Sequence, residues 1–295
     1  MQGLNVVIPA YNAAQHIERA VNSALALNVD PANIIVVDDG STDGTSAVAR
    51  RLGCNVLHQS NAGASHARRS GILAATQPLL ILLDADDALE ATGVAESLRL
   101  GTQVKDWVAI LGSTQARAMG EGAITEMRPW PEGVSVESLL RRGYSPGPPG
   151  AFVWRTAALE TIHTQKPDML SPRFAEDYEL LIRGAALGTV LTHSQISCLY
   201  QTTGGKSSHF PLEDNRTAED IRMHYAEVLG YHAVRRRDSE LRSMALFREA
   251  YTRAGSRLLL SRAYYIARAF MSDPRFVLRL VIRRCARLMK AGQRK

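Results

Sequence analysis

Short apolar runs alternate with stretches of helical spacing along the first hundred residues. The apolar runs are Leu4–Ile8, Ile34–Val37, Val56–His58 and Leu79–Leu83. The segments with apolar residues at helical spacing are Ala13–Leu27, Asp43–Leu52 and Ala64–Ala75. Strands and helices that alternate in this way indicate a parallel sheet with right-handed crossovers. We therefore predict an open α/β fold for this part of the chain.

Beyond residue 106 the pattern is mixed. Trp107–Leu111 and Ala151–Trp154 are predicted strands, and a helix is predicted to open at Phe174-Ala175-Glu176-Asp177. The run 145–150, Ser-Pro-Gly-Pro-Pro-Gly, excludes regular structure and predicts a loop beside a functional site. After residue 213 the chain is expected to be helical and is rich in arginine. These changes predict an α/β domain over residues 1–213 and a helical extension over residues 214–295.

Two acidic clusters follow predicted strands: Asp38-Asp39 comes after the second apolar run and Asp84-Ala85-Asp86-Asp87 after the fourth. In open α/β sheets, ligands bind beyond the carboxyl ends of the strands. Carboxylates crowded at neighbouring strand ends repel each other, and Asp84 and Asp86, two residues apart, would face the same side of a strand. Such oxygen ligands suit Mg²⁺ or Mn²⁺ with substrate phosphates completing the shell. The pattern predicts a metal-assisted enzyme acting on a nucleotide diphosphate compound.

Other nucleotide-binding and targeting signals are missing from the sequence. Pro9-Ala10-Tyr11-Asn12 stands where a Gly-x-Gly-x-x-Gly turn would follow the first strand, and no Walker-type Gly-Lys-Ser/Thr occurs. Neither a signal peptide nor a window of about 18 uncharged apolar residues is present. Three cysteines without metal-type spacing argue against a disulfide framework. The expected location is the cytoplasm, in part as a peripheral protein on the cytoplasmic face of a membrane.

Charge divides the chain into two parts. Residues 1–214 carry 16 Lys/Arg and 22 Asp/Glu, whereas residues 215–295 carry 19 Lys/Arg and 7 Asp/Glu. After Pro274, arginines recur every four residues (Arg275, Arg279, Arg283, Arg287), and a different side is apolar (Val277, Leu280, Val281, Leu288). This basic amphipathic helix either docks on its own domain or lies on an anionic membrane. Nucleic acid is not an expected partner, because the aromatic residues of this segment fit an apolar helix face.

Five motifs, taken in order, resemble glycosyltransferase family 2, whose fold is GT-A, over roughly residues 3–210. They are Ile8-Pro9-Ala10-Tyr11-Asn12, the run 36–45 around Asp38-Asp39-Gly40-Ser41, Asn61-Ala62-Gly63 leading to Ala67-Arg68, Leu83-Asp84-Ala85-Asp86-Asp87, and Glu176-Asp177. The resemblance implies a nucleotide-sugar donor, a donor half of about 1–105 and an acceptor half of about 106–213. It also implies that Pro9, Ala10 and Tyr11 hold nucleobase and ribose. Asp39 would accept a hydrogen bond from the base N–H, which favours uracil, and Arg68 would face base or diphosphate.

The resemblance assigns chemistry to two further motifs. Asp84, Ala85 and Asp86 match the Asp-x-Asp motif, in which the pair meets the ribose and a divalent cation, with Asp86 as the metal ligand. Asp177 matches the catalytic base of an inverting transfer, which deprotonates the acceptor hydroxyl. Glu176 would orient groups or bind acceptor.

The family's flexible loop after the last strand corresponds to residues 200–209, where Lys206 would pair with the diphosphate and His209 would reach the metal. The segment His163–Phe174 departs from the turn that many relatives have before the Glu-Asp motif. No Gln-x-x-Arg-Trp motif is present, which favours one sugar per encounter over processive synthesis.

The expected function is an inverting, metal-dependent glycosyltransferase that uses a UDP-sugar and a glycan or lipid-linked acceptor of the cell envelope or an extracellular polysaccharide. Two alternatives stay open at this point. One is a catalytically silent GT-A scaffold that binds nucleotide. The other is a haloacid-dehalogenase-like phosphatase, because a strand ending in Asp84-Ala85-Asp86 resembles its nucleophile motif.

Overall fold

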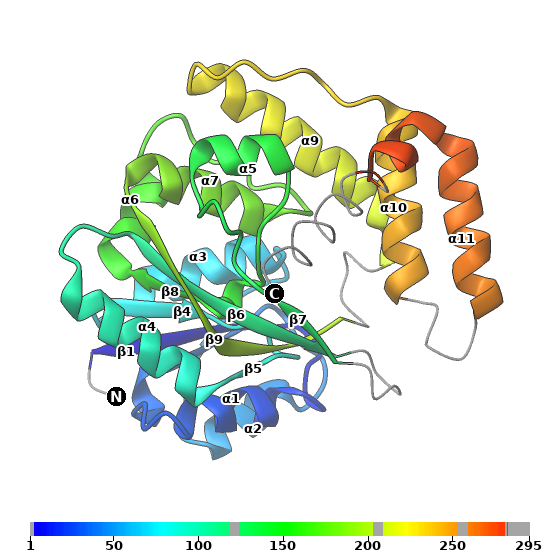
Figure 1. Ribbon diagram of the computed structural model, residues 1–295. Helices are drawn as coiled ribbons and strands as arrows, with labels where there is room; N and C mark the ends of the chain where they lie inside the picture. The colour runs from blue at the N-terminus through cyan, green and yellow to red at the C-terminus, as the bar shows by residue number, and fades with distance from the viewer. Residues whose placement is uncertain (1–2, 118–123, 203–208, 253–258, 281, 283–295) are drawn as a thin grey trace, which may run out of the picture.

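A computed structural model describes residues 3–117, 124–202, 209–252, 259–280 and 282. The strands are β1 Leu4–Ala10, β2 Ile34–Asp38, β3 Asn55–His58, β4 Leu79–Leu82, β5 Ala88–Leu89, β6 Ala109–Arg117, β7 Ile124–Met127, β8 Phe152–Arg155 and β9 Val190–Gln201. The helices are α1 Ile17–Leu25, α2 Thr45–Arg51, α3 Ala64–Ala74, α4 Ala91–Gln103, α5 Val136–Arg142, α6 Thr156–Thr164, α7 Glu176–Leu187, α9 Pro211–Val228, α10 Asp238–Thr252 and α11 Leu259–Ser272. Short 3-10 turns occupy Pro31–Asn33 and Pro149–Ala151. Figure 1 shows their arrangement around one sheet.

The sheet has the strand order β3-β2-β1-β4-β8-β6-β9-β5, with β7 paired to β6. Strands β1 to β4 are parallel, as their sequence pattern predicts, and Val6 on the central strand β1 pairs with Ile34 and Ile81. The later strands mix directions: β8 is antiparallel to β4 and β6, whereas β9 is parallel to β6. The predicted strand at 107–111 begins at Ala109 and runs on to Arg117. The α/β class with a mostly parallel sheet is confirmed.

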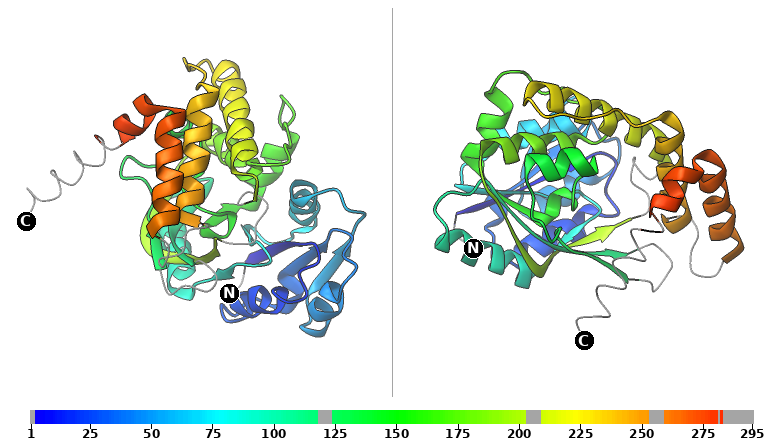
Figure 2. Two further views of the ribbon diagram at one scale, coloured as in Figure 1. Left: turned by 90° about the vertical axis from the view of Figure 1, so that its right-hand side faces the viewer. Right: turned by 45° about the horizontal axis from the view of Figure 1, so that its top comes forward.

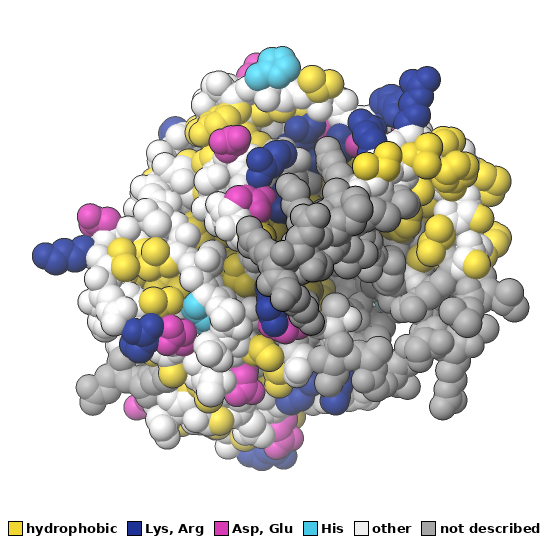
Figure 3. Space-filling model, viewed as in Figure 1, with side chains coloured by type: hydrophobic (Ala, Val, Ile, Leu, Met, Phe, Trp, Pro, Cys, Tyr) yellow, Lys and Arg dark blue, Asp and Glu magenta, His cyan; other side chains and the backbone are white. Residues whose placement is uncertain are grey.

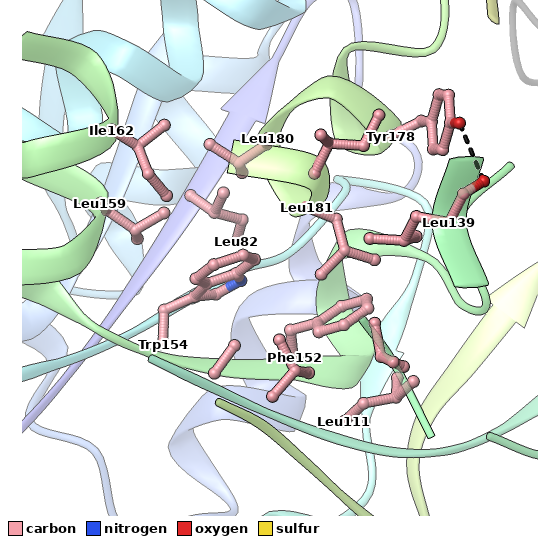
Figure 4. Packing of buried hydrophobic residues seen from close by; sticks show 14 of the residues in the cluster. Leu82, Leu111, Leu139, Phe152, Trp154, Leu159, Ile162, Tyr178, Leu180 and Leu181 are labelled. Carbon is pink, nitrogen blue, oxygen red and sulfur yellow. Dashed lines mark hydrogen bonds between the residues drawn. The ribbon is translucent and has the colours of Figure 1, made fainter. Parts of the chain in front are cut away.

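Alternate residues of the strands build two hydrophobic layers, because successive side chains of a strand point to opposite faces. On one face, Val6 and Ile8 pack with Ile17 of α1 and Val94 of α4. On the other, Val7 belongs to a larger cluster that includes residues of α3, α5, α6, α7 and α9. Figure 4 shows part of this second layer, where Leu82, Phe152 and Trp154 of the sheet meet Leu180 and Leu181 of α7. Helices therefore cover the sheet on both sides.

Helix α9 belongs to the second hydrophobic layer. Its Ile221 and Tyr225 are buried in the same cluster as the sheet residues, and Glu219 pairs with Arg222 and Arg236. The predicted boundary between residues 213 and 214 falls within the first turn of this helix. The division into two units stays a prediction, although the chain continues through α9 as part of the main body.

Helices α10 and α11 pack against each other, and α10 also packs on α9 (Figure 2). The predicted helical character of the extension therefore holds over α9, α10 and α11, and a further helical stretch begins at Pro274. No helix in the described ranges combines the length and the apolar character that crossing a bilayer would need.

Candidate active-site cleft

A cleft with a volume of about 1330 Å³ opens beyond the carboxyl ends of β1 and β4. Segments from eight parts of the chain contribute to its lining: the ends of these two strands, the start of α3, the turn 143–149, the start of α7, the end of β9, and helices α9 and α10. Eight residues predicted from the sequence line it: Pro9, Tyr11, Arg68, Asp84, Ala85, Asp86, Glu176 and Asp177. The fold thus brings most of the predicted site to one place.

The first acidic cluster does not share this cleft wall with the second. Strand β1 lies between β2 and β4, so the expectation that the two clusters follow neighbouring strands is wrong. Asp38 is buried and accepts a hydrogen bond from Ser41 N at 2.8 Å. Asp39 is also buried and accepts hydrogen bonds from Ala62 N at 2.9 Å and Gly63 N at 2.8 Å. Asp39 therefore fixes the turn that leads into α3, and its predicted contact with a nucleobase stays a prediction.

Ala10 is likewise buried and is not among the residues that line the cleft. Its neighbours Pro9 and Tyr11 do line it, and Tyr11 is half exposed. The predicted role of this segment therefore rests on two of its three residues.

Asp84 to Asp87 form a turn rather than the end of a strand. Strand β4 stops at Leu82, and Asp87 N donates to Asp84 O at 3.0 Å. The expectation that Asp84 and Asp86 share one side of a strand is therefore wrong. Both residues nevertheless line the cleft. Burial and the nearby charge of Asp84 raise the pKa of Asp86. The same two causes raise the pKa of the fully buried Asp87 to about 9.

Arg68 joins the acidic turn to the start of α7. Its Nη2 lies 2.5 Å from Asp84 Oδ1, and its Nη1 lies 2.5 Å from Glu176 Oε1. The guanidinium is almost completely buried, and both carboxylates are partly shielded from solvent. The guanidinium therefore joins Asp84, which lies 16 positions from Arg68 in the chain, to Glu176, which lies 108 positions from it. Its predicted contact with base or diphosphate is untested, and its contacts with the two carboxylates were not predicted.

Asp177 lies in the first turn of α7, where the backbone takes an unusual path. Ala175, just before the helix, adopts a left-handed conformation with φ of 56°. Burial, followed by the charges of Glu176 and Asp214, raises the pKa of Asp177 to about 7, although Arg68 acts in the opposite direction. A carboxylate that titrates near neutral pH is suited to accept a proton during a reaction.

Helices α9 and α10 complete the cleft with residues that the sequence analysis missed. Asp214 and Asn215 from α9 and Met244 and Arg248 from α10 line it, and Asp214 forms an ion pair with Arg248. Burial raises the pKa of Asp214 against the effect of Arg248. No local signal marks these residues, because their position depends on how α9 packs on α7 and how α10 packs on α9.

The remaining predicted elements have different outcomes. The run over residues 145–150 lies beside the cleft, as predicted, and Ser145, Gly147, Pro148 and Pro149 line it. The expectation that this run has no regular structure is wrong for its end, because Pro149 begins a 3-10 turn with its fixed backbone angle. Lys206 lies outside the described residues. His209 is exposed and is not among the lining residues.

A divalent cation fits the chemistry of the acidic turn in one specific way. In the described ranges, no group of three or more His, Cys, Asp and Glu side chains is arranged to hold a metal by itself. The turn offers the carboxylates of Asp84 and Asp86, whose mutual repulsion a cation would relieve. Mg²⁺ is commonly held by one or two carboxylates together with substrate phosphates, so the residues fit a cation that arrives with a phosphorylated substrate.

Comparison with solved structures shows a similar fold. S. aureus TarS 1-349 in complex with UDP-GlcNAc superposes with a TM-score of 0.58 at 17% identity, covering 94% of this chain and 83% of that chain. The mannosyltransferase PcManGT from Pyrobaculum calidifontis, in complex with GDP-Man and Mn²⁺, gives a TM-score of 0.54 at 16% identity, covering 97% and 80%. The fold is therefore that of GT-A structures.

Part of the chain is also similar in sequence to known glycosyltransferases. Residues 5–99 match the model described as glycosyl transferase family 2. The succinoglycan biosynthesis protein ExoU of Rhizobium meliloti (strain 1021) is 33% identical over 198 residues, which cover 62% of this chain and 57% of ExoU. The uncharacterized glycosyltransferase YibD of Escherichia coli (strain K12) is 38% identical over 94 residues, or 30% of this chain and 27% of YibD. The chain thus spans little more than half of the first relative and about a quarter of the second.

Proposed function

We propose that this protein transfers a sugar from a nucleoside-diphosphate donor, with UDP favoured, to an acceptor hydroxyl with inversion at the sugar C1. The observation that carries the proposal is the pairing, in one cleft, of the crowded Asp84–Asp86 turn with Asp177, whose pKa is about 7. Leaving-group stabilisation and base catalysis call for two acidic sites of these different kinds.

In the proposed reaction, Asp177 accepts the proton of the acceptor hydroxyl while that oxygen bonds to C1. The bond between C1 and the β-phosphate oxygen breaks, and its electron pair stays with the nucleoside diphosphate. Asp84 and Asp86 would hold a divalent cation, which supplies positive charge at the departing diphosphate. Pro9 and Tyr11 would bind the nucleoside end of the donor.

The acceptor is proposed to bind against α9 and α10, in the part of the cleft where Asp214 and Arg248 lie. ExoU is named as a succinoglycan biosynthesis protein, which supports an extracellular polysaccharide or its lipid-linked precursor as the acceptor class. TarS binds UDP-GlcNAc, which supports a UDP-sugar as the donor. PcManGT binds GDP-Man and Mn²⁺, so a guanine nucleotide is the competing donor class, and Mn²⁺ is a suitable test cation.

A thermal-shift panel of UDP, GDP, TDP and CMP, each with and without Mn²⁺, tests the donor and metal assignments. Ligands that bind the folded state raise Tm by mass action, by an amount equivalent to about 2.7 kcal/mol at a hundredfold excess over Kd. The expected result is a Mn²⁺-dependent shift with UDP that is lost in Asp86→Asn. A shift with GDP alone would change the donor class, and no shift with any nucleotide would favour the phosphatase.

Substitution of the base tests the chemistry separately from binding. Asp177→Asn is expected to lower kcat by about 100- to 10,000-fold, the usual contribution of a general base, while the UDP-induced shift in Tm is retained. Asp168→Asn, at an exposed carboxylate paired with Lys166, is the matched control and should leave kcat unchanged. Transfer at the wild-type rate by Asp177→Asn would show that another group is the base.

A further inference from the structure

The outward side of α11 and of the helical stretch after it forms an apolar surface. Its members are large hydrophobic side chains that the fold leaves exposed: Tyr264, Ile266, Phe270, Met271, Leu278, Leu280 and Ile282. Met271 is 72% exposed and Ile282 is 65% exposed. Figure 3 shows hydrophobic side chains gathered over α11, with Lys and Arg side chains beside them. Contiguous exposed apolar surface of this kind marks an interaction site.

The opposite side of the same segment is already used for packing. Ala269 and Val277 are buried, and Ser243 of α10 donates a hydrogen bond to Ala269 O at 2.8 Å. Ser272 Oγ donates to Ser239 O at 3.1 Å. Because the small residues face α10, the large apolar residues are left facing outward, where α10 does not cover them.

A buried aspartate fixes the direction of the chain after α11. Asp273 Oδ1 accepts a hydrogen bond from Phe276 N at 3.0 Å, which caps the helical stretch beginning at Pro274. Its Oδ2 accepts hydrogen bonds from Arg237 Nη2 at 2.7 Å and from Ser239 Oγ at 3.0 Å. This bend at Asp273 fixes the positions of Leu278 and Ile282 relative to Met271. The relative placement of these exposed side chains is therefore set by the fold.

The charge around this surface selects its partner. Residues 259–295 contain ten Lys/Arg and one acidic residue, Asp273, which is already paired with Arg237. Arg268, Arg275 and Arg279 of this segment are exposed. A second copy of the chain would bring the same positive charges against these, whereas an anionic lipid surface supplies both negative charge and an apolar phase.

We propose that α11 and the helical stretch from Pro274 form a docking surface for an anionic lipid bilayer. The side chains of Phe270, Met271 and Ile282 enter the apolar phase of the bilayer. The basic side chains lie at the headgroups. The bend at Asp273 holds α11 and the helical stretch from Pro274 at a fixed angle, so that both can contact the same bilayer surface. This surface begins before the predicted basic helix, because it includes residues of α11. Phe270, Met271 and Ile282 were not part of the apolar side predicted from the sequence after Pro274. The proposal does not depend on glycosyl transfer.

Co-sedimentation of the full chain with vesicles tests the proposal. The vesicles are phosphatidylcholine with phosphatidylglycerol, and phosphatidylcholine alone. Met271→Ser/Ile282→Ser is expected to lower partitioning to the anionic vesicles at least tenfold at both low and high salt, because apolar burial is insensitive to screening. Arg275→Gln/Arg279→Gln should lower it about 30-fold at low salt and much less at high salt, at roughly 1 kcal/mol for each arginine.

Leu73→Ser, at an exposed leucine of α3, is the matched control and should partition like the wild type. All substituted side chains are exposed, and unchanged Tm and circular dichroism would exclude unfolding as the cause of any loss. Wild-type partitioning of Met271→Ser/Ile282→Ser would overturn the proposal. So would light scattering that shows a dimer which this double variant dissociates, because the surface would then bind a second copy.

Discussion

The carboxyl group of Asp177 couples folding to pH. In an unfolded chain an aspartate titrates near about 3.9, whereas burial and the charges of Glu176 and Asp214 raise the folded pKa of Asp177 to about 7. Between these values the folded protein binds more protons than the unfolded chain. The contribution of this group to stability is therefore complete below about pH 4 and is lost as the pH rises through 7.

Asp177→Asn should for that reason be more stable than the wild type, and the gain should grow with pH. We expect the gain in the free energy of unfolding to increase by roughly 1–2 kcal/mol between pH 5 and pH 8, since one pKa unit corresponds to about 1.4 kcal/mol before solvent screening. Thermal melts of both proteins across this range measure it. Asp168→Asn, whose carboxyl has a pKa lowered by Lys166, should show no such gain. A gain independent of pH would contradict the assignment.

Arg68 holds two carboxylates that are otherwise partly desolvated. Arg68→Gln leaves Asp84 and Glu176 without their shared cation, and breaking a buried pair from one side costs about 3–5 kcal/mol. Urea unfolding should show that loss. Arg99→Gln, which removes an exposed pair with Glu96 on α4, should change stability far less, because solvent screens an exposed ion pair. Equal effects of the two substitutions would mean that Arg68 is only another surface arginine.

At the scale of single elements, helix α7 begins at a strained residue. Ala175 has a left-handed backbone, which costs a residue with a Cβ about 1–2 kcal/mol and costs glycine little. Ala175→Gly should therefore raise the free energy of unfolding by about 0.5–1 kcal/mol. Ala95→Gly, at an exposed interior position of α4, should lower it by about 1 kcal/mol. Differential scanning calorimetry distinguishes the two directions.

The sequence predicts the first half of the sheet better than the second. Buried parallel strands such as β2 and β4 are continuous apolar runs, so their existence and order follow from local pattern. The end of β4 was predicted one residue too late, because Leu83 continues the apolar run without continuing the strand. Strands β5 and β7 are short, and their pairing with β9 and β6 depends on the tertiary arrangement rather than on a local signal.

At the scale of the whole molecule, α9 joins the helical extension to the main body. A chain ending at residue 213 would lose Ile221 and Tyr225 from the larger hydrophobic cluster, and Glu179 would lose the hydrogen bond that Tyr225 Oη donates to it. We expect that chain to be insoluble or to unfold without cooperativity. A chain ending at residue 252 keeps α9 and α10 and should unfold in one transition. Cooperative unfolding of the shorter chain would support the boundary predicted after residue 213.

The candidate site shows the same division between local and long-range information. Residues on sequence motifs, such as Asp84 and Asp177, could be predicted because each motif lies at the end of one element. Asp214 and Arg248 could not, since they meet only after α9 and α10 have packed across the cleft. Asp38 and Asp39 were misplaced for the same reason, because the sequence does not show that β1 lies between their strand and β4.

The two contacts of Arg68 have a consequence for the order of events in the cleft. A cation that binds Asp84 competes with the guanidinium of Arg68 for the same carboxylate. Cation binding therefore weakens the ion pair between Arg68 and Asp84 and leaves Glu176 as the remaining partner of Arg68. Such linkage is reciprocal: the factor by which the cation weakens the ion pair between Arg68 and Asp84 is the factor by which that ion pair weakens cation binding. Glu176→Gln should therefore change the Mn²⁺ concentration that half-saturates the protein, measured by calorimetry with UDP present. Binding at the two walls of the cleft would then be coupled. The contacts of Glu176 on the acceptor side would depend on whether a cation and nucleotide are bound on the donor side.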